Sequence, residues 1–230
     1  MNPDLNGAIA DLPLEEKAAI TAGYDIWTVP GIERLGIPPL RMTDGPNGAR
    51  GANSRLGQGD VRAICVPTGS ALAASFDVEL LGRIGDLLGR EARQKRSRVL
   101  LAPTINMVRS PLYGRAFECY GEDPWLAGTL AAAFVSGVQS QGVATTAKHL
   151  IGNEAEYQRT TINSVIDERT FREVYLLPFE FAIRHGGSLG VMTSYNRVNG
   201  IYCSEDSELL NGILRGEWGF EGFFLSLIHI

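Results

Sequence analysis

The chain has 230 residues, of which 44% are hydrophobic and 20% charged, so it can bury a full core as one domain. Its net charge of -5 and sequence pI near 5.3, without blocks of like charge, argue against nucleic acid or an anionic membrane surface and favour a small-molecule partner. No apolar run approaches the ~20 residues of a membrane span, and the first residues lack the basic and apolar regions of a signal peptide, which predicts a cytoplasmic protein.

Cysteine usage predicts neither a metal site nor a disulfide framework. Cys65, Cys119 and Cys203 are odd in number and lie far apart in the sequence. We expect them to be small buried or half-buried residues. The sequence therefore predicts no metal and no cofactor.

The first part of the chain predicts one helix and then a turn-rich segment. A helix is expected from Pro13 to Ala22, with Asp11 as its cap. Prolines and Gly36 interrupt the segment Ile32–Leu40, so it cannot be an interior strand or a long helix. The following Asp-Gly-Pro-Asn-Gly sequence predicts a tight loop that begins at Asp44, which could be a turn former alone.

From Val66 onward the pattern alternates between apolar strands and amphipathic helices. The expected strands are Ala71–Phe76, Val99–Ala102, Val143–Ala147, Leu189–Thr193 and Gly222–Leu225. The expected helices follow Asp77 to about Lys95, run through Trp125 to about Gln141, and span Asp167–Arg184 and Glu205–Arg215. Asp77 and Asp167 are expected caps, and Pro178 is expected to kink or break its helix. Strands that are apolar throughout are typical of a parallel sheet covered by helices.

Two parallel architectures fit this alternation, a doubly wound sheet and a (β/α)8 barrel. No glycine-rich phosphate-binding sequence follows a strand and opens a helix, which disfavours the nucleotide-binding doubly wound fold. Long polar loops follow successive strands at 106–123, 148–163 and 194–206. In a barrel such loops rise from one face, so the pattern favours a barrel of the TIM type, class α/β.

Polar side chains gather where these strands end, with Lys148 and His149 placed directly after Val143–Ala147. The set comprises Asp44, Arg115, Lys148, His149, Arg159, Tyr195 and Asn196. A carboxylate that accepts from hydroxyls and cations that donate to others would suit a hydroxyl-rich ligand. A phosphate would suit the cations but leave Asp44 misplaced. Alternatively, Arg115 or Arg159 could simply pair with Glu118 or Glu154.

Five motifs in register make the resemblance of this chain to a known family specific. They are DGPNGARG (44–51), GRAFECYGEDP (114–124), AKHLIGNEAEYQR (147–159), MTSYNRVNG (192–200) and the run from Gly219 to Ser226. In order and spacing they resemble the N-terminal barrel domain of glycoside hydrolase family 3, the family of β-glucosidases, β-xylosidases and related exo-acting enzymes. The resemblance implies that residues 1–226 form this barrel in incomplete form, without the following α/β sandwich domain.

The resemblance also implies roles for individual residues in binding a non-reducing-end sugar of a β-glucoside or oligosaccharide. Asp44 would accept from the outer hydroxyls of the sugar with Arg50 nearby. Arg115, Lys148 and His149 would hold the same sugar, supported by Arg159. Met192 and Tyr195 would line the subsite. The implied activity is retaining hydrolysis of O-glycosidic bonds in carbohydrate metabolism.

The sequence departs from the family pattern after Ser226. The family places its nucleophilic aspartate next, but this chain has Leu227 there, within a tail, residues 227–230, that we interpret as atypical or foreign to the gene. The acid/base glutamate of the family usually lies in the sandwich domain, which is expected to be absent. We therefore assign no catalytic residue and expect this chain to be inactive.

Two other functions remain open at this stage. The intact binding motifs together with Leu227 permit a non-catalytic sugar-binding protein. Outside the family, Lys148 could be the Schiff-base amine of an aldolase-type barrel. A lysine followed by histidine in a hydrophilic loop would lack the apolar pocket that activates such an amine.

Overall fold

A curled, six-stranded sheet organises the computed structural model, which describes residues 5–51 and 62–226. In sheet order its strands are β1 (Thr28–Val29), β2 (Leu40–Asp44), β3 (Val99–Leu101), β4 (Ala144–Leu150), β6 (Gly190–Thr193) and β9 (Phe223–Leu225). All neighbours pair in parallel except β1, which is antiparallel to β2. This arrangement confirms the predicted α/β class with a curled, mostly parallel sheet of the barrel type.

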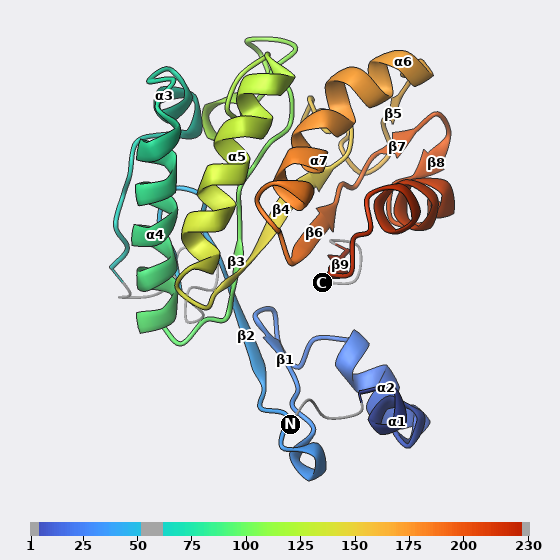
Figure 1. Ribbon diagram of the computed structural model, residues 1–230. Helices are drawn as coiled ribbons and strands as arrows, with labels where there is room; N and C mark the ends of the chain where they lie inside the picture. Colours follow the sequence, from blue (N-terminus) through green and yellow to red (C-terminus); the bar gives the residue numbers. More distant parts are fainter. Residues whose placement is uncertain (1–4, 52–61, 227–230) are drawn as a thin grey trace.

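Two helices precede the first strand, and the later helices cover one side of the sheet (Figure 1). They are α1 (Leu5–Ala10), α2 (Leu14–Thr21), α3 (Gly69–Ala73), α4 (Val78–Gln94), α5 (Pro124–Gln139), α6 (Glu168–Thr170) and α7 (Leu177–Arg184). Short 3₁₀ turns occur at η1 (Glu33–Leu35) and η2 (Ala116–Glu118), and π-helical segments at η3 (Phe171–Leu176) and η4 (Glu208–Glu217). Helices α4, α5 and α7 run side by side, whereas α1 and α2 lie apart from them beyond β1 (Figure 1).

Alternation along the strands divides the core into two clusters. On the outer face, Leu100, Ala147 and Val191 pack with the helices in the large cluster. On the inner face, a small cluster joins Met42, Val99, Leu101 and Met192. Because side chains of a strand alternate between faces, the residue two positions after Met42, which is Asp44, continues the inner face. The inner core of the sheet therefore leads directly to the polar ends of the strands.

Helix α4 shows how the sequence sets local structure and packing. The carboxylate of Asp77 caps the helix by accepting from the backbone N–H of Leu80 at 2.8 Å, which confirms the predicted cap. Gly85 then faces α5 so closely that a β-carbon there would overlap the carbonyl oxygen of Phe134. The absence of a side chain lets the two helix backbones approach, and α4 and α5 form the largest helix interface of the fold.

The predicted strand Ala71–Phe76 is wrong, because this segment belongs to helix α3 and the turn after it. The segment is rich in alanine, the best helix former, and has no β-branched residue. The expected Asp11 cap is also wrong: Pro13 occupies the N-cap of α2 and no side chain caps it. At Pro178 the expected break takes the form of the π-helical η3 just before α7, because proline lacks the N–H of a regular turn.

Strand β4 is longer than predicted and includes Lys148 and His149. The register pairs Lys148 with Met192 and Leu150 with Thr193, so both polar residues lie within the strand and not after it. The ladder with β6 continues to Thr193 and therefore keeps β4 extended. The loops beyond it form a second small sheet, β5 (Asn163–Ser164), β7 (Arg197–Val198) and β8 (Ile201–Tyr202), which the sequence pattern did not indicate. Leu227 and the rest of the expected tail, 227–230, lie outside the described residues.

We predict opposite effects for two alanine substitutions on α4. Gly85→Ala should destabilise the fold by about 2 kcal/mol, because α5 must move to make room for the methyl group. Gly82→Ala should stabilise it by up to about 1 kcal/mol, since the nearest atom to a β-carbon there is 3.8 Å away and alanine favours helix. Urea unfolding followed by circular dichroism measures both. Equal midpoints for the two variants would contradict the close α4–α5 contact.

Candidate functional site

An ion pair between two strands lies at the centre of the candidate site. Lys148 Nζ on β4 donates to Asp44 Oδ1 at the end of β2, at 2.6 Å. Arg50 approaches the other carboxylate oxygen, Oδ2, at 3.0 Å. The Lys148 side chain is 3% exposed and that of Asp44 21%, so ligand can reach the carboxylate more readily than the ammonium.

The strand pattern explains why these two side chains meet. Ala144 packs against the inner cluster, so Lys148, four positions later, also continues the inner face of β4. Strand β3 lies between β2 and β4 but ends at Leu101, which is paired with Asp44. Two strand spacings, roughly 10 Å, separate β2 from β4, and the long lysine side chain spans them. The chain after β3 stays beside β4, where Thr104 forms a bridge with Lys148.

The turn after Asp44 is held by backbone geometry and by helix α4. Gly45 has φ +137°, and a β-carbon there would overlap the carbonyl oxygen of Gly48, so the Asp-Gly-Pro-Asn-Gly turn needs glycine. Glu91 of α4 is buried and accepts from the backbone N–H groups of Ala49 at 2.8 Å and Ile64 at 2.7 Å. This buried carboxylate anchors the turn that carries Arg50.

Asn106, in the loop after β3, contacts both the backbone and the ring of His149. The backbone N–H of His149 donates to Asn106 Oδ1 at 2.9 Å, and Asn106 Nδ2 donates to the His149 carbonyl oxygen, also at 2.9 Å. The imidazole Nδ1 lies 3.3 Å from the same Oδ1, and Nε2 lies 3.0 Å from Arg115 Nη1. The histidine ring therefore connects the buried amide to the guanidinium of Arg115.

Arg115 is in turn fixed by a buried carboxylate. Its Nε donates to Glu118 Oε1 at 2.5 Å, and Thr104 Oγ1 donates to Glu118 Oε2 at 2.7 Å. The alternative that Arg115 pairs with Glu118 is thus confirmed. The pairing uses Nε and leaves Nη1 directed at His149, so the guanidinium is oriented toward the site and not withdrawn from it.

Charge and burial set the protonation states of the two central titratable groups. Burial alone would raise the pKa of Asp44, but the Lys148 ammonium and the Arg50 guanidinium outweigh it and hold that pKa below its usual value. Burial, together with the positive charges of Arg115 and Lys148, lowers the pKa of His149 well below its usual value. At neutral pH the site therefore contains an ionised Asp44 and a neutral His149.

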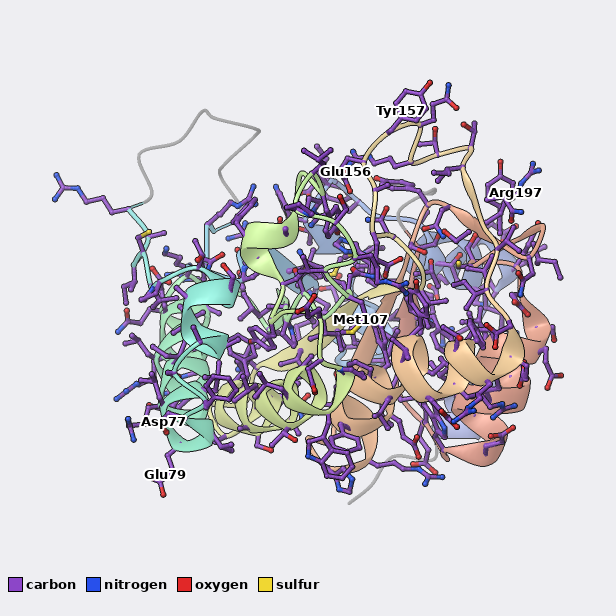
Figure 2. The ribbon with its side chains drawn as sticks, turned by 90° about the horizontal axis from the view of Figure 1, so that it is seen from above. Asp77, Glu79, Met107, Glu156, Tyr157 and Arg197 are labelled. Atoms are coloured by element: carbon purple, nitrogen blue, oxygen red, sulfur yellow. The ribbon has the colours of Figure 1, made fainter. Side chains whose placement is uncertain are left out.

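The remaining expected residues surround this centre. Arg159 lies over the Tyr195 ring at 5.1 Å from its centroid and pairs with Glu156 at 2.8 Å, so its predicted pairing with Glu154 is wrong. Met192 is 2% exposed and packs in the inner cluster below the site. Seen from above, Glu156 and Tyr157 lie on the loop after β4 at the edge of the molecule (Figure 2). The sugar-contacting roles of Arg159, Met192 and Tyr195 stay predictions.

Sequence reasoning missed the residues that support the site, above all Asn106 and Glu91. Asn106 lies five residues after the end of β3 in a loop that was expected to be functional, and this position was the only signal. Glu91 lies on α4 and gave no signal, because a glutamate on an amphipathic helix is normally solvated. Asn196, expected with the polar set, is fully buried, and its Nδ2 donates to the Ile151 carbonyl oxygen.

Residues 5–51 and 62–226 contain neither a candidate metal site nor a candidate membrane-spanning helix. No group of three or more His, Cys, Asp or Glu side chains in these ranges is arranged to hold a metal ion. Within the same ranges, none of the helices combines the length and the apolar character needed to cross a membrane.

Comparison with known proteins identifies the family of this chain. The model of the glycosyl hydrolase family 3 N terminal domain matches residues 16–227. The chain belongs to glycosyl hydrolase family 3. The β-glucosidase of Rhizobium radiobacter is 52% identical to this family 3 chain over 215 residues, which is 94% of the chain and 26% of that protein. A protein described as probable β-glucosidase J from Aspergillus fumigatus is 50% identical over 218 residues, 95% of the chain and 25% of that protein.

Solved structures agree with the family 3 assignment at the level of the fold. The β-glucosidase of Kluyveromyces marxianus in complex with glucose superposes with a TM-score of 0.93 at 43% identity, covering 97% of this chain and 27% of that one. β-Glucosidase 3B of Thermotoga neapolitana in complex with glucose gives 0.90 at 38% identity, covering 96% and 33%. The family 3 chain thus spans between a quarter and a third of the length of these relatives.

We predict that the Asp44–Lys148 pair of this family 3 chain contributes to stability in a pH-dependent way. Asp44→Asn leaves the buried Lys148 cation without its partner and should cost about 3 kcal/mol at pH 7. Because the folded pKa of Asp44 is lowered, this contribution is present above the pKa of the unfolded chain and is lost as pH falls through the folded value.

The measurement is urea unfolding of wild type, Asp44→Asn, and the double variant Asp44→Asn with Lys148→Met. The double variant should regain part of the loss, because no buried charge remains. A cost of Asp44→Asn that is the same at about pH 3 as at pH 7 would be inconsistent with the ion pair.

Proposed function

We propose that this chain is the sugar-binding part of an exo-acting β-glucosidase, in which the terminal glucose of a β-glucoside is held between Asp44, Lys148, Arg115 and His149. The observation that carries the proposal is the exposed side of the Asp44 carboxylate, which is flanked by two cations at the open end of the sheet. The names of the relatives support the β-glucosidase class, and glucose is present in two of the compared structures.

The proposed binding mode follows from the donors and acceptors of the site. The ionised Asp44 accepts from adjacent hydroxyls on the outer edge of the ring, and Lys148 and Arg50 keep it ionised. Arg115 donates to a further hydroxyl, while the neutral ring of His149 accepts from Arg115 with its Nε2 lone pair and so orients that guanidinium. Many directional contacts of this kind fix the sugar in one orientation before any chemistry occurs.

The ion pair argues against the Schiff-base alternative. A Schiff-base lysine must lose its proton to attack a carbonyl carbon. Lys148 donates to a carboxylate at 2.6 Å, and this contact stabilises the ammonium form. An aldolase-type lysine needs an apolar pocket that favours its neutral form, whereas this contact favours the charged form.

A non-catalytic sugar-binding role is the second candidate, and the residue after Ser226 favours it. The family pattern places the nucleophilic aspartate there, but this chain has Leu227, whose side chain has no lone pair to attack an anomeric carbon. Leu227 lies outside the described residues, so its identity and not its geometry carries this argument. We propose accordingly that the chain with Leu227 binds sugar without turnover.

The binding proposal predicts that the chain takes up glucose and that Asp44→Asn weakens the affinity more than tenfold. The loss corresponds to about 1.5 to 3 kcal/mol for hydrogen bonds to a charged group. Isothermal titration calorimetry measures it, under conditions in which circular dichroism shows the variant folded. Glu79→Gln is the matched acid-to-amide control, because the Glu79 side chain is 91% exposed on α4. Equal affinities of wild type and Asp44→Asn would remove Asp44 from the site.

The turnover proposal predicts no hydrolysis of an aryl β-glucoside by the chain with Leu227, because a leucine side chain has no lone pair with which to attack an anomeric carbon. Activity should return when the segment after Ser226 is replaced by that of the Rhizobium radiobacter relative. A 2-fluoro glucoside should then label the aspartate that follows Ser226. Robust turnover by the unaltered chain would overturn this proposal.

A further inference from the structure

A half-buried carboxyl group, Glu154, lies next to Asn106 and has no role in the binding mode above. It follows β4 by four residues, and its Oε1 lies 3.5 Å from Asn106 Nδ2. The Asn106 side chain in turn contacts His149 through both its oxygen and its nitrogen. The Asn106 amide group therefore lies between Glu154 and His149.

Two backbone groups of His149 determine which atom of the Asn106 amide is the oxygen and which is the nitrogen. The His149 N–H can only donate, so the amide atom 2.9 Å from it must be Oδ1. The His149 carbonyl can only accept, so the atom 2.9 Å from it must be Nδ2. The amide carbonyl consequently faces the imidazole Nδ1 at 3.3 Å.

The same reasoning determines the tautomer of His149. A guanidinium is a donor only, so Nε2, 3.0 Å from Arg115 Nη1, must accept with its lone pair. A neutral imidazole then carries its proton on Nδ1, which donates to Asn106 Oδ1. Both lone pairs of the amide oxygen and one of the two Nδ2 hydrogens are thereby used by His149. Only the second Nδ2 hydrogen remains, and Glu154 Oε1 is its acceptor.

We propose that Glu154 is a positioning residue that acts through Asn106 to hold His149 in the Nδ1–H tautomer, with the Nε2 lone pair accepting from Arg115. Without this acceptor, a buried N–H of Asn106 lacks a partner, and the amide must tilt to find another. A tilted amide weakens the bond from Nδ1–H, so that the contact with Arg115 alone favours this tautomer. The tautomer is assigned from the hydrogen-bond geometry alone. Its expected effect on sugar affinity rests on the proposed function.

The charged and titratable groups around Glu154 come from the loop after β3 and from η3. Arg109 donates to the hydroxyl of Tyr175 at 2.7 Å, while Tyr113 and Cys119 lie nearby in the same loop. Burial raises the pKa of Glu154 to about 8, although hydrogen bonds from Asn106 and from the Met107 backbone, and the charge of Arg109, act to lower it. The carboxyl group is thus neutral at pH 7 and becomes charged above pH 8.

The surroundings explain why the neutral form suits this position. Met107, next to Asn106, is 1% exposed and lies in the middle of the molecule in Figure 2. A neutral acid can accept from Asn106 there without a buried charge. Once ionised, the carboxylate is attracted to Arg109, and its contact with Asn106 must compete with that attraction. The environment of His149 should therefore change as Glu154 loses its proton.

The test is a long-range ¹H–¹⁵N spectrum of the chain labelled at histidine, which has three histidines. We expect wild-type His149 to be neutral and in the Nδ1–H form from about pH 6 to about pH 9, with the exposed His185 giving a separate set of ring signals in the same spectrum. Glu154→Ala should give a mixture of tautomers. Glu154→Gln should restore the Nδ1–H form, because its amide oxygen accepts the same bond. Glu79→Ala, at the far edge of Figure 2, is the control and should match wild type.

Two further readouts separate positioning from a general effect on folding. The ring ¹⁵N signals of His149 should shift with a midpoint near pH 8 in wild type, but not in Glu154→Gln. Glucose affinity should fall about fivefold in Glu154→Ala, as expected for one weakened hydrogen bond, and should recover in Glu154→Gln. If Glu154→Ala does not fold, the comparison of wild type with Glu154→Gln across pH still decides.

The outcomes distinguish this proposal from the proposed function. Wild-type tautomer populations in folded Glu154→Ala, or a step near pH 8 that persists in Glu154→Gln, would overturn the role of Glu154. The expected tautomer shifts without any glucose binding by wild type would support Glu154 and count against the sugar-binding proposal alone.

Discussion

The ion pair between Lys148 and Asp44 is the constraint on which the site depends. Burying an ammonium that is 3% exposed costs several kcal/mol of solvation, by general estimate, and a single partner rarely repays it. An apolar pair at these two positions would fit the inner cluster below and would give an equally stable or more stable fold. The ion pair is thus better explained by ligand binding than by stability. Its exposed member is the carboxylate, which is the group that a hydroxyl-rich ligand would contact.

The rest of the structure serves to bring these two charges together. The Lys148 side chain reaches from β4 to the end of β2, and the glycine turn after Asp44 returns the chain so that Arg50 reaches the same carboxylate. Buried acids at Glu91 and Glu118 each satisfy groups on neighbouring loops. The polar groups are consequently linked through hydrogen bonds to elements on both sides of the sheet, and such networks hold a site in one arrangement before ligand arrives.

Sequence reasoning predicted the class of fold and the central residues of the site, because both follow from periodicity and from motifs. It failed where two local preferences compete. Ala71–Phe76 was short and apolar like a strand, and only the high helix propensity of alanine distinguishes it. Lys148 was expected after its strand because a charged residue normally ends an apolar run, but the register with β6 carries β4 past it. Asn106 could not be predicted, since its role depends on the backbone of a residue 43 positions away.

The charge balance of the described site indicates what it cannot supply by itself. Lys148, Arg50 and Arg115 face the carboxylates of Asp44 and Glu118, so this group of five carries one net positive charge while His149 is neutral. Such a site suits a neutral sugar in its ground state, whose hydroxyls both donate and accept. It does not stabilise the positive charge of an oxocarbenium-like transition state, which needs a carboxylate close to the anomeric carbon. We therefore expect binding and chemistry to be separable in the proposed function, with the identity of the residue after Ser226 deciding whether a bound sugar reacts.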